Sequence, residues 1–238
     1  MTRISLRLVR ALSVAFFIIF TAAVTPASAA PGDLDTSFDG DGKVTTAIGA
    51  SSGLARAVAI QGDGKFVAAG HCRIGSADDF CLARYNADGS LDTTFDGDGK
   101  VTTAIGASDD RAHAVAIQSD GKIVAAGECL IGSTIDFCLV RYNANGSLDT
   151  TFDGDGKVTT AIGAGDDFAR AMAIQGDGKI VVAGFCVIAS TYDFCLARYN
   201  ANGSLDSSFD TDGKVTTAIG ANDLAHAVAI QSDGKIVA

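Results

Sequence analysis

The feature that most constrains the fold is a module of 57 residues that the chain repeats. The stretch at 90–107, SLDTTFDGDGKVTTAIGA, returns letter for letter at 147–164, and similar copies stand at 33–50 and 204–221. Periods of this size are typical of propellers, solenoids and repeat arrays, in which each unit buries its apolar face against its neighbours. The repeat therefore has to be interpreted before any local motif.

Counting from the glycine ahead of each copy gives three complete repeats and a partial fourth. These repeats are 32–88, 89–145, 146–202 and 203–238. The fourth repeat ends at Ala238, inside the stretch that corresponds to its third strand. We therefore expect the missing C-terminal blades of a longer chain to be among the partners of this segment.

Within one repeat, four short apolar stretches are separated by turn residues. In the second repeat we expect strands at 100–105, 112–118, 122–130 and 136–143. The alanine-rich stretch at 112–118 has good helix formers, but it is shorter than a usual helix and turn residues follow it. Four antiparallel strands at this period are typical of a propeller blade. The predicted fold is all-β: an incomplete β-propeller-like array of four-stranded antiparallel blades. A parallel β-helix is the alternative, although its rungs are usually much shorter.

The amino terminus has the pattern of a secretory signal peptide over residues 1–29. A basic start is followed by an apolar run at 11–24 and by Ala27-Ser28-Ala29, a small-x-small cleavage site. An uncleaved membrane anchor is the alternative, but the run is shorter than the roughly 20 residues that a spanning helix needs. We expect a secreted, periplasmic or cell-surface protein with no membrane insertion after cleavage.

The chain is acidic, with 18 Lys and Arg against 28 Asp and Glu. Almost every acidic residue is an aspartate, and most stand beside glycine, where aspartate closes local hydrogen bonds of turns. An acidic chain with no basic stripe argues against nucleic acid as a partner.

Six cysteines form three pairs with equal spacing. They are Cys72 with Cys81, Cys129 with Cys138, and Cys186 with Cys195. A two-residue turn centred on Ser133-Thr134 would place Cys129 directly opposite Cys138, close enough for a disulfide. We therefore predict one disulfide in each complete blade, which export to an oxidising compartment would permit. Buried thiols and a zinc site are the alternatives, and the spacing lacks the C-x2-C pattern of zinc.

A repeated Asp-Gly-Asp-Gly string invites a calcium hypothesis. Its aspartates are Asp39 and Asp41, Asp96 and Asp98, Asp153 and Asp155, and Asp210 and Asp212. Calcium prefers six to eight oxygen ligands, whereas this string offers two carboxylates and is followed directly by a lysine. A tight turn that leads into a strand is the simpler interpretation, and calcium is the one cofactor we consider.

Two further columns of cations recur with the repeat. The first joins Arg56, His113, Arg170 and His226, and a ring of such side chains near a propeller axis would suit an anionic ligand. Ordinary pairing with nearby aspartates is the alternative. The second column joins Arg84, Arg141 and Arg198, which we expect to pair with a recurring aspartate such as Asp92.

Catalysis finds little support in the sequence. The chain has three histidines, one glutamate and no G-x-S-x-G string, so no nucleophile and base are evident. We expect no enzyme, but a non-catalytic binding or structural scaffold for a protein or glycan ligand. The loops at 74–78, 131–135 and 188–192 differ between repeats and are the expected places of ligand contact. The alternatives are a calcium-stabilised adhesive repeat and a fragment of a propeller hydrolase whose active site lies in the missing part.

Three strings carry a family resemblance: DGKIVAAG at 120–127, DFCLARYNANGSLDSSF at 193–209 and GKVTT at 99–103. They resemble the delta-60 repeat, a bacterial extracellular β-propeller-like repeat of unknown function. The resemblance covers nearly all of 32–238, and it implies a secreted or surface-associated propeller without supplying catalytic residues. The paired cysteines depart from the pattern, and the number of repeats is below that of a full ring.

Overall fold

The structure is a computed structural model that describes residues 30–49 and 53–238. The predicted signal peptide lies outside the described residues. Contacts divide the chain after Asp33 into two compact units. In the first unit the described residues form a turn, in which the Asp33 backbone N–H donates to the carbonyl oxygen of Ala30. All that follows concerns the second unit, Leu34–Ala238.

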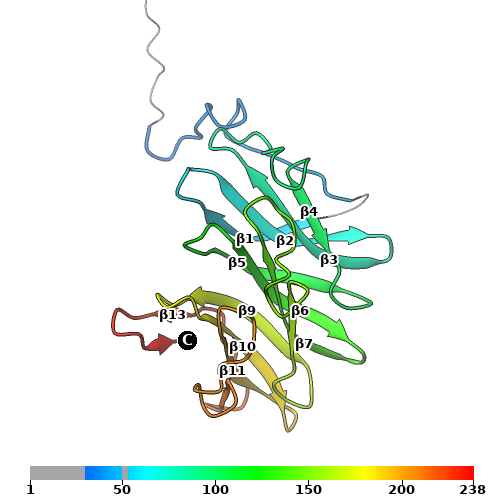
Figure 1. Cartoon of the computed structure of the whole chain (residues 1–238), viewed down its shortest axis with the longest axis vertical. Coiled ribbons are helices and arrows are strands. Elements are labelled where there is room, and N and C mark those ends of the chain that lie inside the picture. The colour runs from blue at the N-terminus through cyan, green and yellow to red at the C-terminus, as the bar shows by residue number, and fades with distance from the viewer. Residues whose placement is uncertain (1–29, 50–52) are drawn as a thin grey trace, which may run out of the picture. The chain divides into compact units, whose positions relative to one another are not determined.

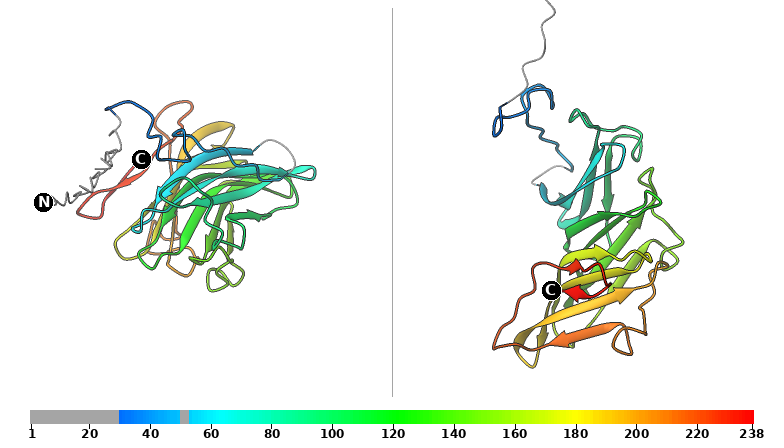
Figure 2. Two further views of the ribbon diagram at one scale, coloured as in Figure 1. Left: turned by 90° about the horizontal axis from the view of Figure 1, so that it is seen from above. Right: turned by 90° about the vertical axis from the view of Figure 1, so that its left-hand side faces the viewer.

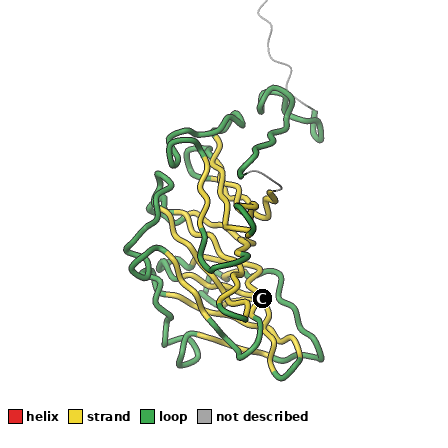
Figure 3. Tube along the Cα trace, turned by 90° about the vertical axis from the view of Figure 1, so that its right-hand side faces the viewer, coloured by secondary structure: helices red, strands yellow, loops and turns green. Residues whose placement is uncertain are grey.

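Across the described residues the regular structure consists of strands alone, joined by turns and loops (Figures 1 and 3). The first sheet contains β1 (Gly53–Ile60), β2 (Phe66–Ile74), β3 (Ala77–Tyr85) and β4 (Lys100–Thr103). The second contains β5 (Asp110–Ile117), β6 (Ile123–Ile131), β7 (Thr134–Tyr142) and β8 (Lys157–Thr160). The third contains β9 (Asp167–Ile174), β10 (Ile180–Ile188), β11 (Thr191–Tyr199) and β12 (Lys214–Thr217). A two-stranded sheet of β13 (Ala229–Ile230) and β14 (Ile236–Val237) follows.

Each four-stranded sheet is an antiparallel meander in sequence order, as expected for a propeller blade. The alanine-rich stretches form the first strands β1, β5 and β9, so the prediction of strand over helix is confirmed. These first strands contact one another in succession and form the inner edge of the array. Figure 2 shows the sheets of the array from two further directions. Within the part of the chain that is described, no helix has the length and apolarity to cross a membrane.

The sheets keep the period of 57 residues, but their phase differs from the repeats drawn in the sequence. The second sheet begins at Asp110 and ends at Thr160, whereas the second repeat was drawn from 89 to 145. The KVTT strand of the second, third and fourth repeats is thus the outermost strand of the preceding sheet. Self-similarity fixes a period and leaves the starting point open, because strand pairing depends on contacts between distant residues.

The apolar core lies between neighbouring sheets. Val67, Phe80 and Leu82 of the first sheet pack with Ile123 and Tyr142 of the second, and all five are fully buried. An equivalent cluster joins the second sheet to the third. Each sheet is therefore stabilised by its neighbours, since burial of large apolar side chains contributes about 1.5–3 kcal/mol each.

In each four-stranded sheet an arginine near the end of the third strand pairs with a buried aspartate in the loop that follows, and we call this pair the clamp. In the second sheet Arg141 Nε donates to Asp149 Oδ2 at 2.7 Å, and Lys122 Nζ lies 2.9 Å from the same oxygen. The Arg141 guanidinium covers the Phe152 ring at 4.5 Å and donates to the carbonyl oxygen of Ala201 in the next repeat. The predicted pairing is confirmed in every copy: Arg84 with Asp92, Arg141 with Asp149, and Arg198 with Asp206.

The clamp sets the protonation state of its carboxylate. Burial alone would raise the pKa of Asp149, but hydrogen bonds from Thr151 and Lys122 and the nearby Arg141 charge lower the pKa well below its ordinary value. The carboxylate therefore remains charged inside the protein and can hold both cations.

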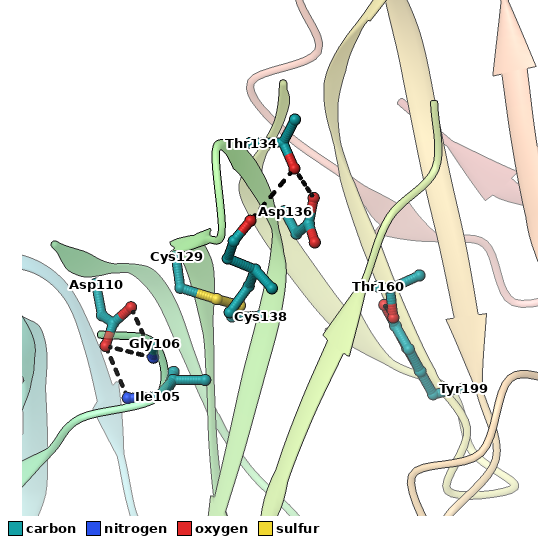
Figure 4. The surroundings of a disulfide bond; sticks show 10 residues. Ile105, Gly106, Asp110, Cys129, Thr134, Asp136, Cys138, Thr160 and Tyr199 are labelled. Carbon is teal, nitrogen blue, oxygen red and sulfur yellow. Dashed lines mark hydrogen bonds between the residues drawn. A yellow bond between two sulfur atoms is a disulfide. The ribbon is translucent and has the colours of Figure 1, made fainter. Parts of the chain in front are cut away.

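The six cysteines form three disulfides in the predicted pairs: Cys72–Cys81, Cys129–Cys138 and Cys186–Cys195. The predicted register was wrong by two residues. Ile131 pairs with Thr134, so the turn is centred on Gly132-Ser133, and Cys129 lies opposite Asp136 instead of Cys138. The bond joins side chains that are diagonal on one face of β6 and β7, with Cα atoms 6.0 Å apart (Figure 4). This separation is within the usual range for a disulfide.

Replacing Cys129 and Cys138 together with serine is expected to lower the free energy of unfolding by roughly 2–3 kcal/mol, because the bond closes a short loop in the unfolded chain. Urea unfolding of the double variant beside the oxidised wild type measures this difference. Alkylation of the unreduced wild type followed by mass spectrometry is the control. Labelling of all six thiols in that control would contradict the pairing.

Candidate functional site

The first strand of every four-stranded sheet carries a β-bulge at the same position. In the second sheet Ala112 pairs with Gly127 and Ala114 with Ala126, which leaves His113 as the extra residue. Arg56 and Arg170 are the extra residues in the first and third sheets. Bulges of this kind redirect a side chain out of the regular alternation of a strand. The predicted ligand column is therefore a column of bulge residues.

The glycine opposite each bulge makes the distortion possible. A Cβ atom on Gly127 would lie 2.0 Å from the carbonyl oxygen of Arg111, and the equivalent distances at Gly70 and Gly184 are both 1.8 Å. No side chain fits at such distances, so the neighbouring strand can approach only a glycine. The bulge thus requires a glycine at this place.

The bulge residues line one hollow of about 510 Å³. The structure brings together all four members of the predicted column: Arg56, His113, Arg170 and His226. It adds His71, Arg111 and Glu128, which were not expected in the site, and Asp78 from the loop at 74–78, where ligand contact was expected. These come from the start of β5, the ends of β2 and β6 and the start of β3, which antiparallel pairing places at one end of the sheets. We call this the inner-strand hollow.

Glu128 lines the hollow and contacts side chains from two sheets. Arg170 Nη1 donates to Glu128 Oε2 at 2.7 Å and also lies 2.7 Å from His113 Nε2. His113 Nε2 is 3.5 Å from Glu128 Oε1. Burial would raise the pKa of Glu128, but His113 and the Arg170 charge lower the pKa below its ordinary value. Glu128 is therefore a charged acceptor that links the second and third sheets.

A second charged group lies on the side of the first sheet. Arg111 donates to Asp78 Oδ2 from Nε at 3.0 Å and from Nη2 at 2.8 Å. Arg73 Nη1 donates to the other oxygen of Asp78 at 3.2 Å. Burial would raise the pKa of Asp78, but the hydrogen bonds from Arg111 and Arg73 lower it. The first and second sheets are thus also joined across the hollow by an ion pair.

His71 differs from its neighbours because its ring is buried without a full set of partners. It is 9% exposed, and its Nδ1 atom has no hydrogen-bond partner among the described residues. Burial lowers the pKa of His71, and the Arg56 and Arg111 charges lower it further against the opposing attraction of Asp78. The ring is therefore held in its neutral form at neutral pH.

The lowered pKa of His71 predicts how stability depends on pH. Below the ordinary histidine pKa of about 6.5 the unfolded chain binds a proton that the folded chain resists, so stability falls as pH drops from about 6.5. His71→Gln is expected to reduce this decline, whereas replacing the exposed His226 with glutamine serves as the control. Urea unfolding at pH 7.5, 6.5 and 5.5 measures the slope. An unchanged slope in His71→Gln would refute the assignment.

The hollow is where the repeats differ most in chemistry. The residues equivalent to Arg111 are Leu54 and Phe168, and those equivalent to Glu128 are His71 and Phe185. The residues equivalent to Asp78 are Ile135 and Tyr192. The same positions thus hold leucine, histidine and aspartate in the first sheet, two charged residues and isoleucine in the second, and aromatic residues in the third. These residues could have been found in the sequence by aligning the repeats and looking for positions where the type of side chain changes, instead of positions where it is the same.

The third sheet contributes an aromatic surface beside the hollow. The Phe168 and Phe185 rings stack with centroids 4.9 Å apart, and Tyr192 meets Phe185 edge-on at 5.4 Å. The Arg170 guanidinium lies 5.4 Å from the Phe168 centroid and 5.1 Å from that of Phe185. The Tyr192 side is open to solvent, since this residue is 39% exposed. We call Phe168, Phe185 and Tyr192 the aromatic wall.

The aspartates of the calcium hypothesis serve as turn residues. The backbone of Asp96 has a φ of 49°, and its N–H donates to the carbonyl oxygen of Asn145, which follows the third strand of the next sheet. Asp98 Oδ1 accepts the backbone N–H of Lys100 at 2.9 Å, and every copy repeats this bond. Among the described residues there is no group of three or more His, Cys, Asp or Glu side chains arranged to hold a metal. These turns are held by their own hydrogen bonds, and calcium binding stays a prediction.

The stacked antiparallel sheets define an incomplete β-propeller-like array. A family model described as "Domain of unknown function (DUF5122) beta-propeller" matches residues 61–95, 118–152 and 175–209. Each matched segment spans the second and third strands of one sheet and the clamp loop that follows them. No curated protein matches the chain. The comparisons thus agree with the repeat and the fold, and they assign no ligand.

Proposed function

We propose that the protein is an exported, non-catalytic binding scaffold of the delta-60 repeat type, with the inner-strand hollow as its ligand site. The proposal rests on one observation: the repeats differ in residue type at positions in and beside the hollow, while the rest of the sheet architecture recurs. The residues that hold the sheets together, such as the clamp arginines and the bulge glycines, form a frame that recurs in all three sheets. The positions of Arg111, Glu128 and Asp78 instead change between charged, apolar and aromatic residues. A purely structural array has no need of such changes at one place.

The chemistry of the hollow supports binding over catalysis. Its two carboxylates, Asp78 and Glu128, each accept hydrogen bonds from arginine and have lowered pKa values. A carboxylate held in this way is a poor general base, because a base works best with a pKa near the operating pH. The charged and aromatic side chains around a concave site instead resemble the lining of ligand pockets.

Export has its own support. The three disulfides suit an oxidising compartment, and the sequence of residues 1–29 has the pattern of a signal peptide. Expressing the full reading frame with a C-terminal tag and sequencing the amino terminus of the mature protein tests this part. Retention inside the cell without cleavage would contradict it.

The binding role is tested on a panel of immobilised glycans and proteins. The variant pair is Arg56→Glu, which reverses a charge in the hollow, and Lys235→Glu, which reverses a charge on a side chain that is 75% exposed and outside the hollow. We expect ligands that the wild type and the Lys235 variant retain and the Arg56 variant loses. The proposal fails if every bound ligand is insensitive to Arg56, or if a bound ligand is chemically converted.

A further inference from the structure

We propose that the ligand of the inner-strand hollow is an acidic saccharide, whose carboxylate is held by Arg56 and His71 of the first sheet and whose sugar ring packs on the aromatic wall. This inference rests on the proposed binding function and adds the chemical class of the ligand.

The hollow has an excess of positive charge, although the chain as a whole is acidic. Three arginines line it, Arg56, Arg111 and Arg170, against the two carboxylates of Asp78 and Glu128. Arg111 and Arg170 are paired with these carboxylates, whereas Arg56 has no ion-pair partner in the part of the chain that the structure places. In a chain with 28 acidic residues, an unpaired arginine inside a hollow selects for an anion.

Unused hydrogen-bonding capacity lies next to this arginine. His71 lines the hollow, is 9% exposed and has a buried Nδ1 atom without a partner among the described residues. A buried polar atom without a partner costs free energy that a ligand can recover. Arg56 and His71 therefore form a place for a group that accepts hydrogen bonds and carries negative charge, such as a carboxylate.

Next to Arg170, which lines the hollow, the third sheet offers an apolar surface of the kind that sugars use. Phe168 occupies the place that Arg111 has in the second sheet, and Phe185 occupies the place of Glu128. Pyranose rings present C–H groups on one face, which pack against aromatic rings, and hydroxyl groups at the edge. The carboxylates of Asp78 and Glu128 provide acceptors for those hydroxyls, beside the donors of the arginines.

These features together distinguish the ligand from simpler ones. An inorganic anion would use Arg56 and His71 and leave the aromatic wall without a role. A neutral saccharide would use the wall and the carboxylates and leave Arg56 without a partner. A saccharide with a carboxylate uses all of them, and the hollow of about 510 Å³ is within the range of small-molecule pockets.

Isothermal titration calorimetry of the full chain tests the inference with three probes: trigalacturonate, the neutral trisaccharide maltotriose and inorganic phosphate. We expect trigalacturonate to bind at least tenfold more tightly than either of the others, and more weakly as salt concentration rises. Arg56→Gln and Tyr192→Ala are each expected to weaken trigalacturonate binding about tenfold. Lys235→Gln, which removes an exposed charge outside the hollow, is expected to leave the affinity unchanged.

The outcomes separate the ligand class from the binding role. Equal affinity for phosphate and trigalacturonate would show a site for anions in general, and equal affinity for maltotriose would remove the role of the carboxylate. Either result, or the absence of trigalacturonate binding, overturns the assignment of an acidic saccharide. If the panel of glycans and proteins still contains an Arg56-dependent ligand, the proposed function stands without this assignment.

Discussion

Replacing Asp149 with alanine is expected to lower the free energy of unfolding by about 3–5 kcal/mol, because it leaves the buried Arg141 and the half-buried Lys122 without their shared carboxylate. The substitution also frees the guanidinium that covers Phe152 and reaches the carbonyl oxygen of Ala201 in the next repeat. The variant therefore loosens the contact between the second and third sheets as well as its own loop.

The matched control is Asp177→Ala, which removes the same charge from an exposed turn. Asp177 accepts hydrogen bonds from the backbone and side chain of Lys179, and its side chain is 55% exposed. Exposed pairs of this kind contribute up to about 1 kcal/mol. Urea unfolding at neutral pH compares both variants with the wild type. Equal losses at the two positions would show that the clamp is no more important than a surface pair.

Gly127→Ala is the second substitution with a large expected effect, about 3 kcal/mol, since the added Cβ would lie 2.0 Å from the carbonyl oxygen of Arg111. The strand β5 can move away only by losing the bulge that directs His113 into the inner-strand hollow. We therefore expect this variant to lose ligand binding together with stability.

The chain itself provides the control for the glycine substitution. Gly132 has a φ of 63° and no atom within 4 Å of an added Cβ, and the third repeat has Ala189 at the same place with a φ of 50°. Gly132→Ala is therefore expected to cost about 1 kcal/mol, the ordinary price of a left-handed alanine. Thermal unfolding of the two alanine variants separates steric overlap from backbone conformation. The account of the bulge is wrong if Gly127→Ala is the milder of the two.

Much of the frame could be predicted from the sequence because it depends on local patterns. Asp-Gly turns and short β-branched stretches gave the strands, and the clamp between Arg141 and Asp149 followed from two residues that recur at a constant spacing. Local patterns could not predict which strand begins each sheet and which strand ends it. The pairing of β7 with β8 joins residues from two repeats, and no local pattern distinguishes it from pairing within one repeat.

The pairing register of β6 with β7 and the full set of residues in the hollow were likewise only partly predictable from the sequence. The cysteine pairs followed from spacing alone, but the turn position depended on whether Gly132 or Thr134 belongs to the turn, and both patterns fit the letters. The column of Arg56, His113, Arg170 and His226 was visible as a recurring cation. Asp78 lies in the variable loop at 74–78, where ligand contact was expected, whereas Arg111 and Glu128 were missed because they lie within strands and do not recur between repeats.

Taken together, the proposals describe a repeated frame that presents one non-repeated hollow in which an acidic saccharide binds. Amide NMR of the isotope-labelled full chain, titrated with trigalacturonate, tests this claim most directly. We predict that the perturbed signals gather at the bulges of β1, β5 and β9 and at Tyr192, with little change in the Asp-Gly-Asp-Gly turns. Signals that change equally in all three repeats, that centre on those turns, or that do not change at all would contradict it.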